Sequence, residues 1–254
     1  MKIAATTVGT RGPETPAQNQ QRLEAARHAL RAAKELGSDV LVLPGGYFVT
    51  YDHRSGDDMA KSLINEAKKL GLAVLFGADE HNTKPVQLGA KIKAKLQKQT
   101  AEWWPDPMYG YAWSPTENKI HCCRQRSISS KDQWSVPTNV CEQVRTFMIG
   151  AESLGVLICG EIFNQRIRDA LKNHEPKPIV VADLGHIGAG FKIHWGMKAL
   201  CEGNKGIATM CSLHVQGQNA MKRYCIPGKG YMSTRNSDIT VMGPPRIEIK
   251  MLEF

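Results

Sequence analysis

The sequence predicts a layered α/β protein, because segments typical of strands and of helices alternate through its first 80 residues. Residues 2–8 have the pattern of a short strand. Apolar residues at spacings of three and four between Gln18 and Leu36 then indicate an amphipathic helix. Gly37 follows it, where a glycine often ends a helix. The run "DVLVLP" after this glycine predicts a strand that is buried on both faces.

The same alternation continues along the chain. Residues 59–70 predict a second helix, which Gly71 ends before the strand "LAVLFGA". The segments "WWPDPMYGYAWSP" and "IHCCRQRSIS" predict a hairpin that turns between Pro115 and Lys119. Further strands are expected near Val144 to Ile149 and at "GVLIC", "PIVVAD" and "GIATMCSLHV", with helices at 164–171 and at "HWGMKALCEGNK". No repeat or linker divides the chain, so we expect a single domain over residues 1–254.

Composition and charge narrow the class of protein. The chain is 42% hydrophobic and 22% charged, which is typical of a globular protein with a sizeable core. It has no apolar run near 18 residues and no signal-like start, so we expect a cytoplasmic protein without a membrane partner. The seven cysteines lack the spacing of a disulfide framework, which indicates reduced thiols. The chain has no CxxC pair, so the sequence does not predict a zinc site. The net charge is +9, but the sequence contains no recognised nucleic-acid-binding motif. It therefore does not favour DNA or RNA as a partner.

Cys159 is the residue with the clearest chemical setting. The apolar run Leu154–Ile158 ends at this cysteine and breaks at once into Gly160-Glu161. A strand that turns into a helix at a cysteine can expose the sulfur, and the helix N-terminus lowers the pKa of the thiol. Free cysteines are also often buried without any reactivity. Cys159 is therefore either a nucleophile or one more buried thiol.

The order of motifs resembles the carbon–nitrogen hydrolase (nitrilase) superfamily. The matching segments are "LVLP" at the end of an early strand, the hairpin strand "KIHCCRQRS", "LICGE" with Cys159, and a later helix with Trp195 and Asn204. They cover the chain from about Lys2 to Pro227. The resemblance implies an α-β-β-α sandwich, in which two sheets pack face to face with helices outside.

The resemblance also implies a reaction. In that family a glutamate is the general base, a lysine stabilises the oxyanion, and the cysteine forms a thioester that water cleaves. It implies no cofactor and no metal, a small amide, nitrile or carboxylate as ligand, and a homo-oligomer. Cys159 matches the nucleophile, and Glu161 matches the acidic residue two places on, which we interpret as support for the turn.

Two positions of the family's triad differ in this chain. Gly45 stands where the general base is expected, and Arg126 stands at the position of the lysine. An arginine keeps its charge and could hold an oxyanion or a carboxylate. Gln133 falls near a second family glutamate, and we expect it to contact substrate. Among the histidines after Cys159, His186, His194 and His214 are candidates, because a histidine next to a thiol could activate it.

Gly45 and Gly46 have two interpretations. Paired glycines can form a tight turn where a Cβ would clash. Alternatively, the missing carboxylate leaves room for a ligand, which Tyr47 and Phe48 would line. For the whole protein, the sequence leaves open a slow or altered thiol acyltransferase or amidase, and a non-catalytic ligand-binding or partner subunit with the same fold.

Overall fold

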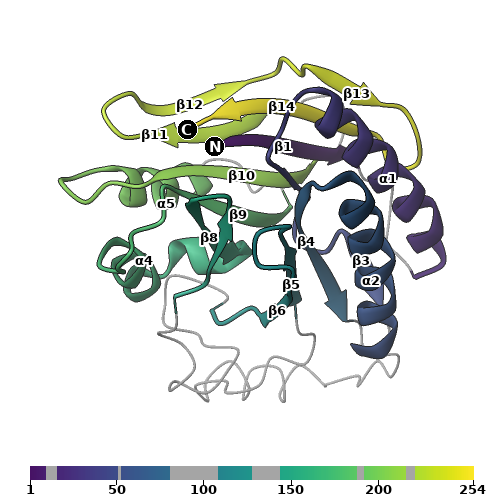
Figure 1. Ribbon diagram of the computed structural model, residues 1–254. Coiled ribbons are helices and arrows are strands. Elements are labelled where there is room, and N and C mark those ends of the chain that lie inside the picture. The colour runs from purple at the N-terminus through teal and green to yellow at the C-terminus, as the bar shows by residue number, and fades with distance from the viewer. Residues whose placement is uncertain (10–15, 51–52, 81–107, 128–143, 188–191, 216–220) are drawn as a thin grey trace, which may run out of the picture.

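The computed structural model describes residues 1–9, 16–50, 53–80, 108–127, 144–187, 192–215 and 221–254 (Figure 1). Its helices are α1 (Asn19–Glu35), α2 (His53–Leu70), α4 (Gln165–Lys172) and α5 (Lys192–Cys201), with short 3₁₀ segments η1 (Pro16–Gln18) and η3 (Cys159–Phe163). Its strands are β1 (Lys2–Gly9), β2 (Val40–Val42), β3 (Phe48–Thr50), β4 (Ala73–Glu80), β5 (Met108–Trp113), β6 (Ile120–Arg124), β7 (Thr146–Ile149), β8 (Glu152–Ile158), β9 (Val180–Ile187), β10 (Ala208–Val215), β11 (Lys222–Ile226), β12 (Gly230–Thr234), β13 (Ile239–Val241) and β14 (Ile247–Glu253).

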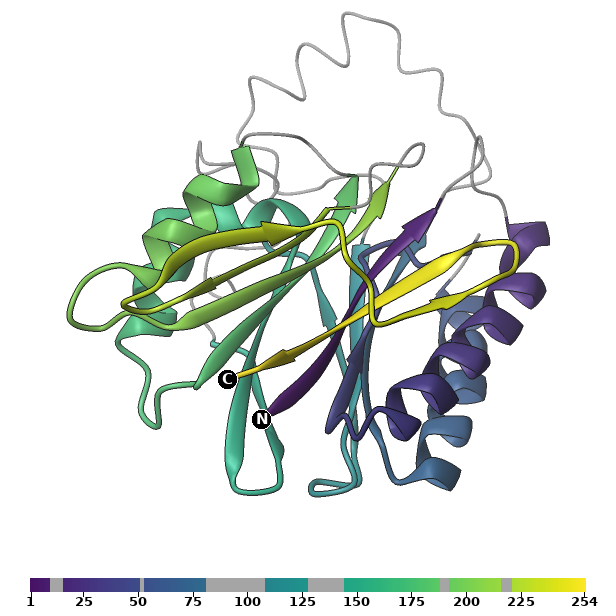
Figure 2. The ribbon, with the colours of Figure 1, turned by 90° about the horizontal axis from the view of Figure 1, so that it is seen from above.

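The strands pair in one continuous path, β6-β5-β4-β2-β1-β10-β9-β8-β7. Strand β1 joins the two halves of this path, because it pairs with β2 through Ile3–Ala5 and with β10 through Thr7–Gly9. Strand β14 runs antiparallel along β1, so the first and last strands of the chain lie side by side (Figures 1 and 2). The hairpin expected around Pro115 to Lys119 is confirmed, since β5 and β6 pair antiparallel.

The two halves of the sheet path face each other across an apolar layer. This layer takes residues from both halves, including Val42 and Leu75 on one side and Val156, Ala182 and Met210 on the other. Helices α1 and α2 cover one outer face, and α4 and α5 cover the opposite one (Figure 2). The layered α/β fold expected from the sequence is therefore confirmed.

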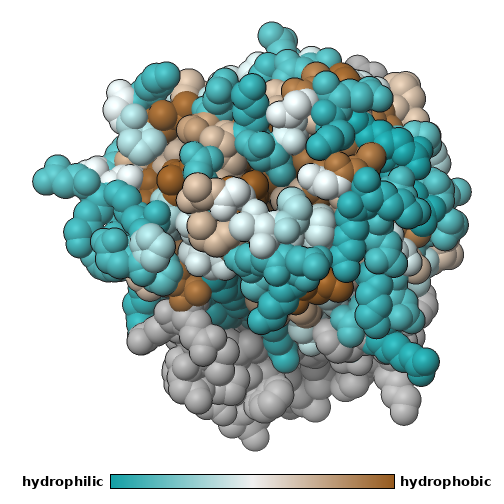
Figure 3. All heavy atoms as spheres, in the orientation of Figure 1, coloured by the Kyte–Doolittle hydropathy of each residue, from teal (hydrophilic) through white to brown (hydrophobic). Residues whose placement is uncertain are grey.

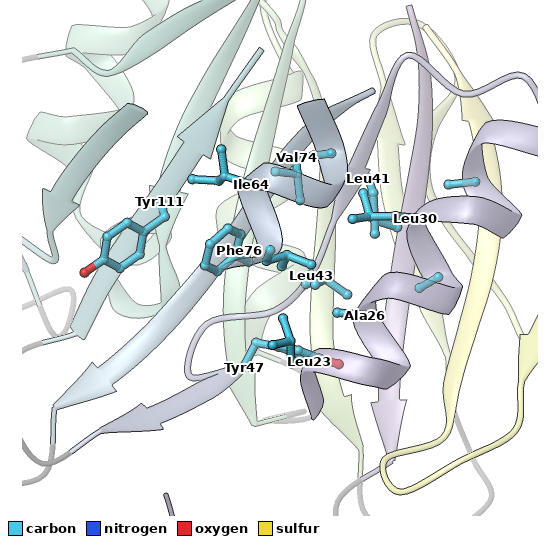
Figure 4. Packing of buried hydrophobic residues seen from close by; sticks show 14 of the residues in the cluster. Leu23, Ala26, Leu30, Leu41, Leu43, Tyr47, Ile64, Val74, Phe76 and Tyr111 are labelled. Atoms are coloured by element: carbon cyan, nitrogen blue, oxygen red, sulfur yellow. The ribbon is translucent and has the colours of Figure 1, made fainter. Parts of the chain in front are cut away.

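The packing of α1 follows directly from its sequence pattern. Leu23, Ala26 and Leu30 lie on one face of the helix and are at most 3% exposed. They pack on Leu41 and Leu43 from the segment around β2 (Figure 4). Burying such an apolar stripe is the main source of stability for a surface helix.

The parallel strands end at a common edge. Strands β2, β1, β10, β9 and β8 pair in parallel, and β4 runs parallel to β2. Gly45 follows β2, and Cys159 follows β8. In open α/β sheets, ligands bind outside the carboxyl ends of the strands. The fold therefore brings the two sequence-predicted positions to the same edge.

No helix in the described ranges is long and apolar enough to span a membrane. On the face shown in Figure 3, hydrophilic residues cover much of the side formed by α1 and α2.

The layer between the two sheet halves should be sensitive to cavities. Met210 is fully buried there, whereas Met242 is 80% exposed. We expect Met210→Ala to lower the free energy of unfolding by about 2–5 kcal/mol. Met242→Ala, the same chemical change at the surface, should alter it by less than about 0.5 kcal/mol. Urea denaturation of both variants measures the difference, and equal effects would contradict this assignment of the core.

Candidate functional site

Cys159 lies at a sharp turn between a strand and a helix. Strand β8 ends at Ile158 in an extended conformation, with φ −119° and ψ 109°. Cys159 then adopts φ +48°, in the left-handed region that non-glycine residues rarely occupy. Holding such a residue there costs about 1–3 kcal/mol, so the surrounding structure must impose it. The thiol is partly exposed and packs against the layer between the sheets.

Glu161 imposes this turn through hydrogen bonds to the backbone and to two arginines. Its carboxylate is completely buried and accepts from the Ile158 N–H at 3.1 Å, so it closes the turn around Cys159. It also accepts from the Arg126 N–H at 2.6 Å and pairs with the guanidinium groups of Arg126 and Arg145, each at 3.1 Å. The turn over residues 158–161, called the elbow below, is thereby held to the chain segments that follow β6 and precede β7.

The charge on Glu161 is stabilised by its partners. Burial opposes ionisation, but the guanidinium groups of Arg145 and Arg126 outweigh it and hold the pKa of this carboxyl below its ordinary value. The cluster therefore contains two fixed positive charges and one negative charge. Glu161, at the centre of this cluster, follows Cys159 by two residues.

The far end of η3 has a second anchor. The Asn164 side chain accepts from the N–H groups of Arg166 and Ile167, which caps α4. Its amide nitrogen donates to the hydroxyl of Ser127 at 3.2 Å. Gln125 donates to the carbonyl of Ile158 at 3.2 Å. The segment after β6 therefore holds both ends of the elbow.

Arg126 occupies a different setting from the one expected. Its side chain is only 3% exposed, and its guanidinium is paired with Glu161. The structure thus places Arg126 beneath the elbow as a partner of a buried carboxylate. Sequence reasoning missed Arg145, the second partner, because it belongs to no motif and reaches Glu161 from 16 residues away.

Gly45 is in close contact with the end of β9. A Cβ built on it would lie 2.7 Å from the carbonyl oxygen of Leu184, closer than side chains approach backbone. Its N–H donates to the carbonyl of Gly185 at 3.1 Å. A Cβ on Gly77 would in turn lie 2.5 Å from the Cα of Gly45. The expectation of free space at position 45 is wrong, because backbone from β9 fills it, and the tight-turn interpretation holds.

His214 contacts the same turn. Its ring is 3% exposed, and its Nε2 lies 2.9 Å from the carbonyl oxygen of Gly45. A carbonyl only accepts hydrogen bonds, so Nε2 carries the proton in this contact. In the neutral ring, Nδ1 then keeps its lone pair. From the sequence, His214 was only one of several histidines after Cys159, and its contact with Gly45 could not be predicted.

The two expected substrate contacts have different outcomes. Tyr47 is fully buried on the α1 side of the sheet, and its hydroxyl donates to the carbonyl of Arg22 at 2.7 Å (Figure 4). The expectation that it lines a ligand pocket is therefore corrected, because the ring fills the core and its hydroxyl is satisfied there. Gln133 lies outside the described residues.

Asp183 is a buried acid behind the elbow. It lies on β9, is 1% exposed, and accepts from the thiol of Cys211 at 3.2 Å. Among the described residues, its second oxygen has no hydrogen-bond partner. Burial raises the pKa of Asp183 well above its ordinary value, and the charge of Glu161 raises it further. Its surroundings therefore favour the neutral form of this acid over the charged form.

The described part of the chain contains no group of three or more His, Cys, Asp or Glu side chains arranged to hold a metal ion. The site consists of the thiol, the arginine–glutamate cluster, the turn at Gly45 and the acid at Asp183.

No family model and no curated protein matches the sequence. Solved structures are similar in fold. The NitN amidase from Neterenkonia sp. AN1 has a TM-score of 0.62 at 14% identity, covering 96% of this chain and 92% of that chain. A cysteine-to-serine variant of the Nesterenkonia AN1 amidase, described as a member of the nitrilase superfamily, has a TM-score of 0.60 at 13% identity, covering 96% and 90%. A cysteine-to-alanine variant in complex with butyramide has a TM-score of 0.61 at 12% identity, covering 97% and 90%. The fold of this chain is that of nitrilase-superfamily amidases.

Adding one methyl group at position 45 should test the close packing there. Gly45→Ala forces a Cβ against a backbone oxygen that cannot move cheaply, so we expect a loss of about 1–3 kcal/mol in the free energy of unfolding. Gly243→Ala is the control, because a Cβ there meets nothing closer than 3.9 Å. Urea denaturation compares the two variants. A Gly45→Ala protein as stable as the control would show that position 45 has room.

Asp183 should make stability depend on pH. An unfolded aspartate has a pKa near 3.9, and the folded one is higher, so the folded state binds more protons between the two values and loses stability as pH rises through that window. We expect Asp183→Asn to gain about 1–3 kcal/mol at pH 8 relative to pH 5. Denaturation at both pH values measures this.

Asp238→Asn is the matched control for Asp183→Asn. Lys250 and the Met251 N–H outweigh desolvation and lower the pKa of Asp238, so the stability that its carboxylate contributes is present above the unfolded pKa and is lost in acid. Because pH 5 and pH 8 both lie above the unfolded pKa, this variant should be destabilised by nearly the same amount at the two pH values. Identical pH dependence in the two variants would contradict the neutral state of Asp183.

Proposed function

We propose that this chain is a member of the nitrilase superfamily that uses Cys159 to form a thioester with a small amide or nitrile. The observation that carries the proposal is the left-handed conformation of Cys159 at the end of β8, held by the buried Glu161. A strained residue at a strand–helix turn is the usual setting of an exposed nucleophile. The similar amidase from Nesterenkonia supports it, because a structure of that protein carries an adduct at its active-site cysteine.

For an amide, the steps follow from the chemistry of the thiol. The Cys159 sulfur attacks the carbonyl carbon, and the tetrahedral intermediate collapses as the C–N bond breaks. The amine leaves with a proton, and a thioester remains on the enzyme. Water then attacks the thioester, which releases the carboxylic acid and restores the thiol.

The positive charge of the arginine cluster is the main aid to this reaction. Arg126 and Arg145 together exceed Glu161 by one charge, which lowers the cost of a thiolate and of a nearby oxyanion. Gly45 offers no acid or base group, so deprotonation of the thiol has no carboxylate at this position. Because a general base typically contributes 10²–10⁴-fold, we expect turnover to be slower by about that factor than in a site that has one.

The alternative is a non-catalytic subunit that binds a small amide or carboxylate. Two observations favour it: backbone fills the place of the general base, and Arg126 is already paired with Glu161. In this case Cys159 is a packing residue, and ligand binding survives its replacement by alanine.

Thioester trapping separates the two functions. We expect incubation with butyramide, followed by acid quenching and intact-mass spectrometry, to show a mass gain of one butyryl group. The gain should vanish in Cys159→Ala and remain in Cys122→Ala, which is the matched control. Absence of any acyl adduct in the wild-type protein would favour the binding subunit.

Alkylation rates add an independent measure. Desolvation is the largest cause that raises the pKa of Cys122 to about 11, so this thiol should react slowly at pH 7 and serve as an internal reference. An activated Cys159 should react with iodoacetamide at least about ten times faster than Cys122. Equal rates would contradict an activated nucleophile.

A further inference from the structure

A hollow lies between the outer edges of the two sheet halves. It has a volume of about 350 Å³ and is bounded by β5 and β6 on one side and by β7 and β8 on the other. Part of its lining is apolar, with Leu75, Ala112, Phe147 and Val156, each at most 5% exposed, and the rest is largely polar. Of the described residues, neither Cys159 nor Arg126 lines it. The hollow therefore adjoins the elbow through Arg145 but does not include the thiol of Cys159.

The walls of the hollow are fixed to each other. The turn between β5 and β6 reaches across to the edge strand β7, where the Met148 N–H donates to Glu117 at 2.6 Å. The Gly150 N–H donates to the hydroxyl of Thr116 at 2.7 Å. These bonds connect the turn between β5 and β6 to β7 and to the residue that follows it. The space is consequently part of the folded structure and not a gap that side-chain motion would close.

The rim of the hollow is basic. Lys119 and Arg145 lie on it together with His121, which is paired with Glu117. Arg145 is engaged with Glu161. Lys119 is exposed and forms no ion pair with any residue that the structure describes. An apolar interior with an ammonium group at its mouth matches a ligand that has a hydrocarbon body and an anionic head.

We propose that this hollow binds a small amphiphilic carboxylate, with its hydrocarbon part between Ala112, Phe147 and Val156 and its carboxylate at Lys119. The volume falls within the range of about 300–1,000 Å³ that is usual for small-molecule sites. Such sites combine an apolar lining with a few polar groups that fix orientation. The proposal does not depend on the chemistry of Cys159, since a protein without thioester activity would keep the hollow.

Octanoate is the probe for this site, with the affinity measured by ligand-observed NMR on the full chain. We expect a dissociation constant below about 1 mM for the wild-type protein. Ala112→Leu fills the interior and should weaken binding at least about tenfold. Thr146→Phe tests the same point from the half-buried rim, where a change perturbs the core less. Both variants count only if their unfolding midpoints match that of the wild-type protein.

Two further comparisons test the orientation of the ligand. Lys119→Gln should weaken octanoate binding about two- to fivefold, the range of an exposed ion pair. Lys177→Gln, an exposed lysine remote from the hollow in the sequence, should leave it unchanged. The wild-type protein should bind octanol more weakly than octanoate. The Lys119→Gln variant should bind octanol and octanoate with equal affinity.

Thiol protection locates the ligand. Cys123 lines the hollow, and burial raises the pKa of its thiol, so alkylation is followed at pH 9. Octanoate should slow the labelling of Cys123 and not that of Cys159. Protection of Cys159 instead, no binding at 1 mM octanoate, or unchanged affinity in folded Ala112→Leu and Thr146→Phe would each overturn the proposal.

Discussion

The local structure around the elbow depends on one buried carboxylate. Glu161 has no solvent exposure, yet it stays charged because two guanidinium groups and backbone N–H groups surround it. It connects the end of β8, the segment after β6 and the segment before β7. Removing one partner of such a buried ion pair typically lowers the free energy of unfolding by about 3–5 kcal/mol, because it leaves an uncompensated charge in the protein interior. The same contacts hold Cys159 in its left-handed conformation. The interactions that stabilise the buried charge therefore also offset the strain at Cys159.

The glycine at position 45 is consistent with its surroundings. Gly45, Gly77 and Gly185 meet where strand ends from the two sheet halves approach each other, and a Cβ on any of them would lie under 3 Å from a neighbour. A glutamate could not be restored at position 45 without moving β9. Glycine at this position is thus one part of the close contact between the two halves, to which His214 adds a hydrogen bond. Any thiol chemistry here relies on fixed positive charge and not on a carboxylate at this turn.

The sequence predicted the alternation of elements and the strand–turn–helix at Cys159, because both are local patterns of apolar residues and glycines. It could not predict which residues meet Glu161. Arg145 is 16 positions away and carries no motif, and only the pairing of β7 with β8 brings it close. Tyr47 was misassigned for a related reason. It lies two residues after Gly45, and after a glycine turn the spacing of residues does not fix which face of the sheet a side chain occupies. Contacts of this kind are set by long-range packing.

Glu161 and Asp183 are two buried acids near the elbow whose pKa values shift in opposite directions. Glu161 has arginine partners that favour its charged form, whereas the one hydrogen-bond partner of Asp183 among the described residues is the thiol of Cys211, and burial favours its neutral form. Each choice favours the other, because the charge of Glu161 raises the pKa of Asp183. A second negative charge at Asp183 would cancel the positive excess of Arg126 and Arg145 and oppose a thiolate at Cys159. A neutral Asp183 therefore preserves the electrostatic setting on which the proposed nucleophile depends.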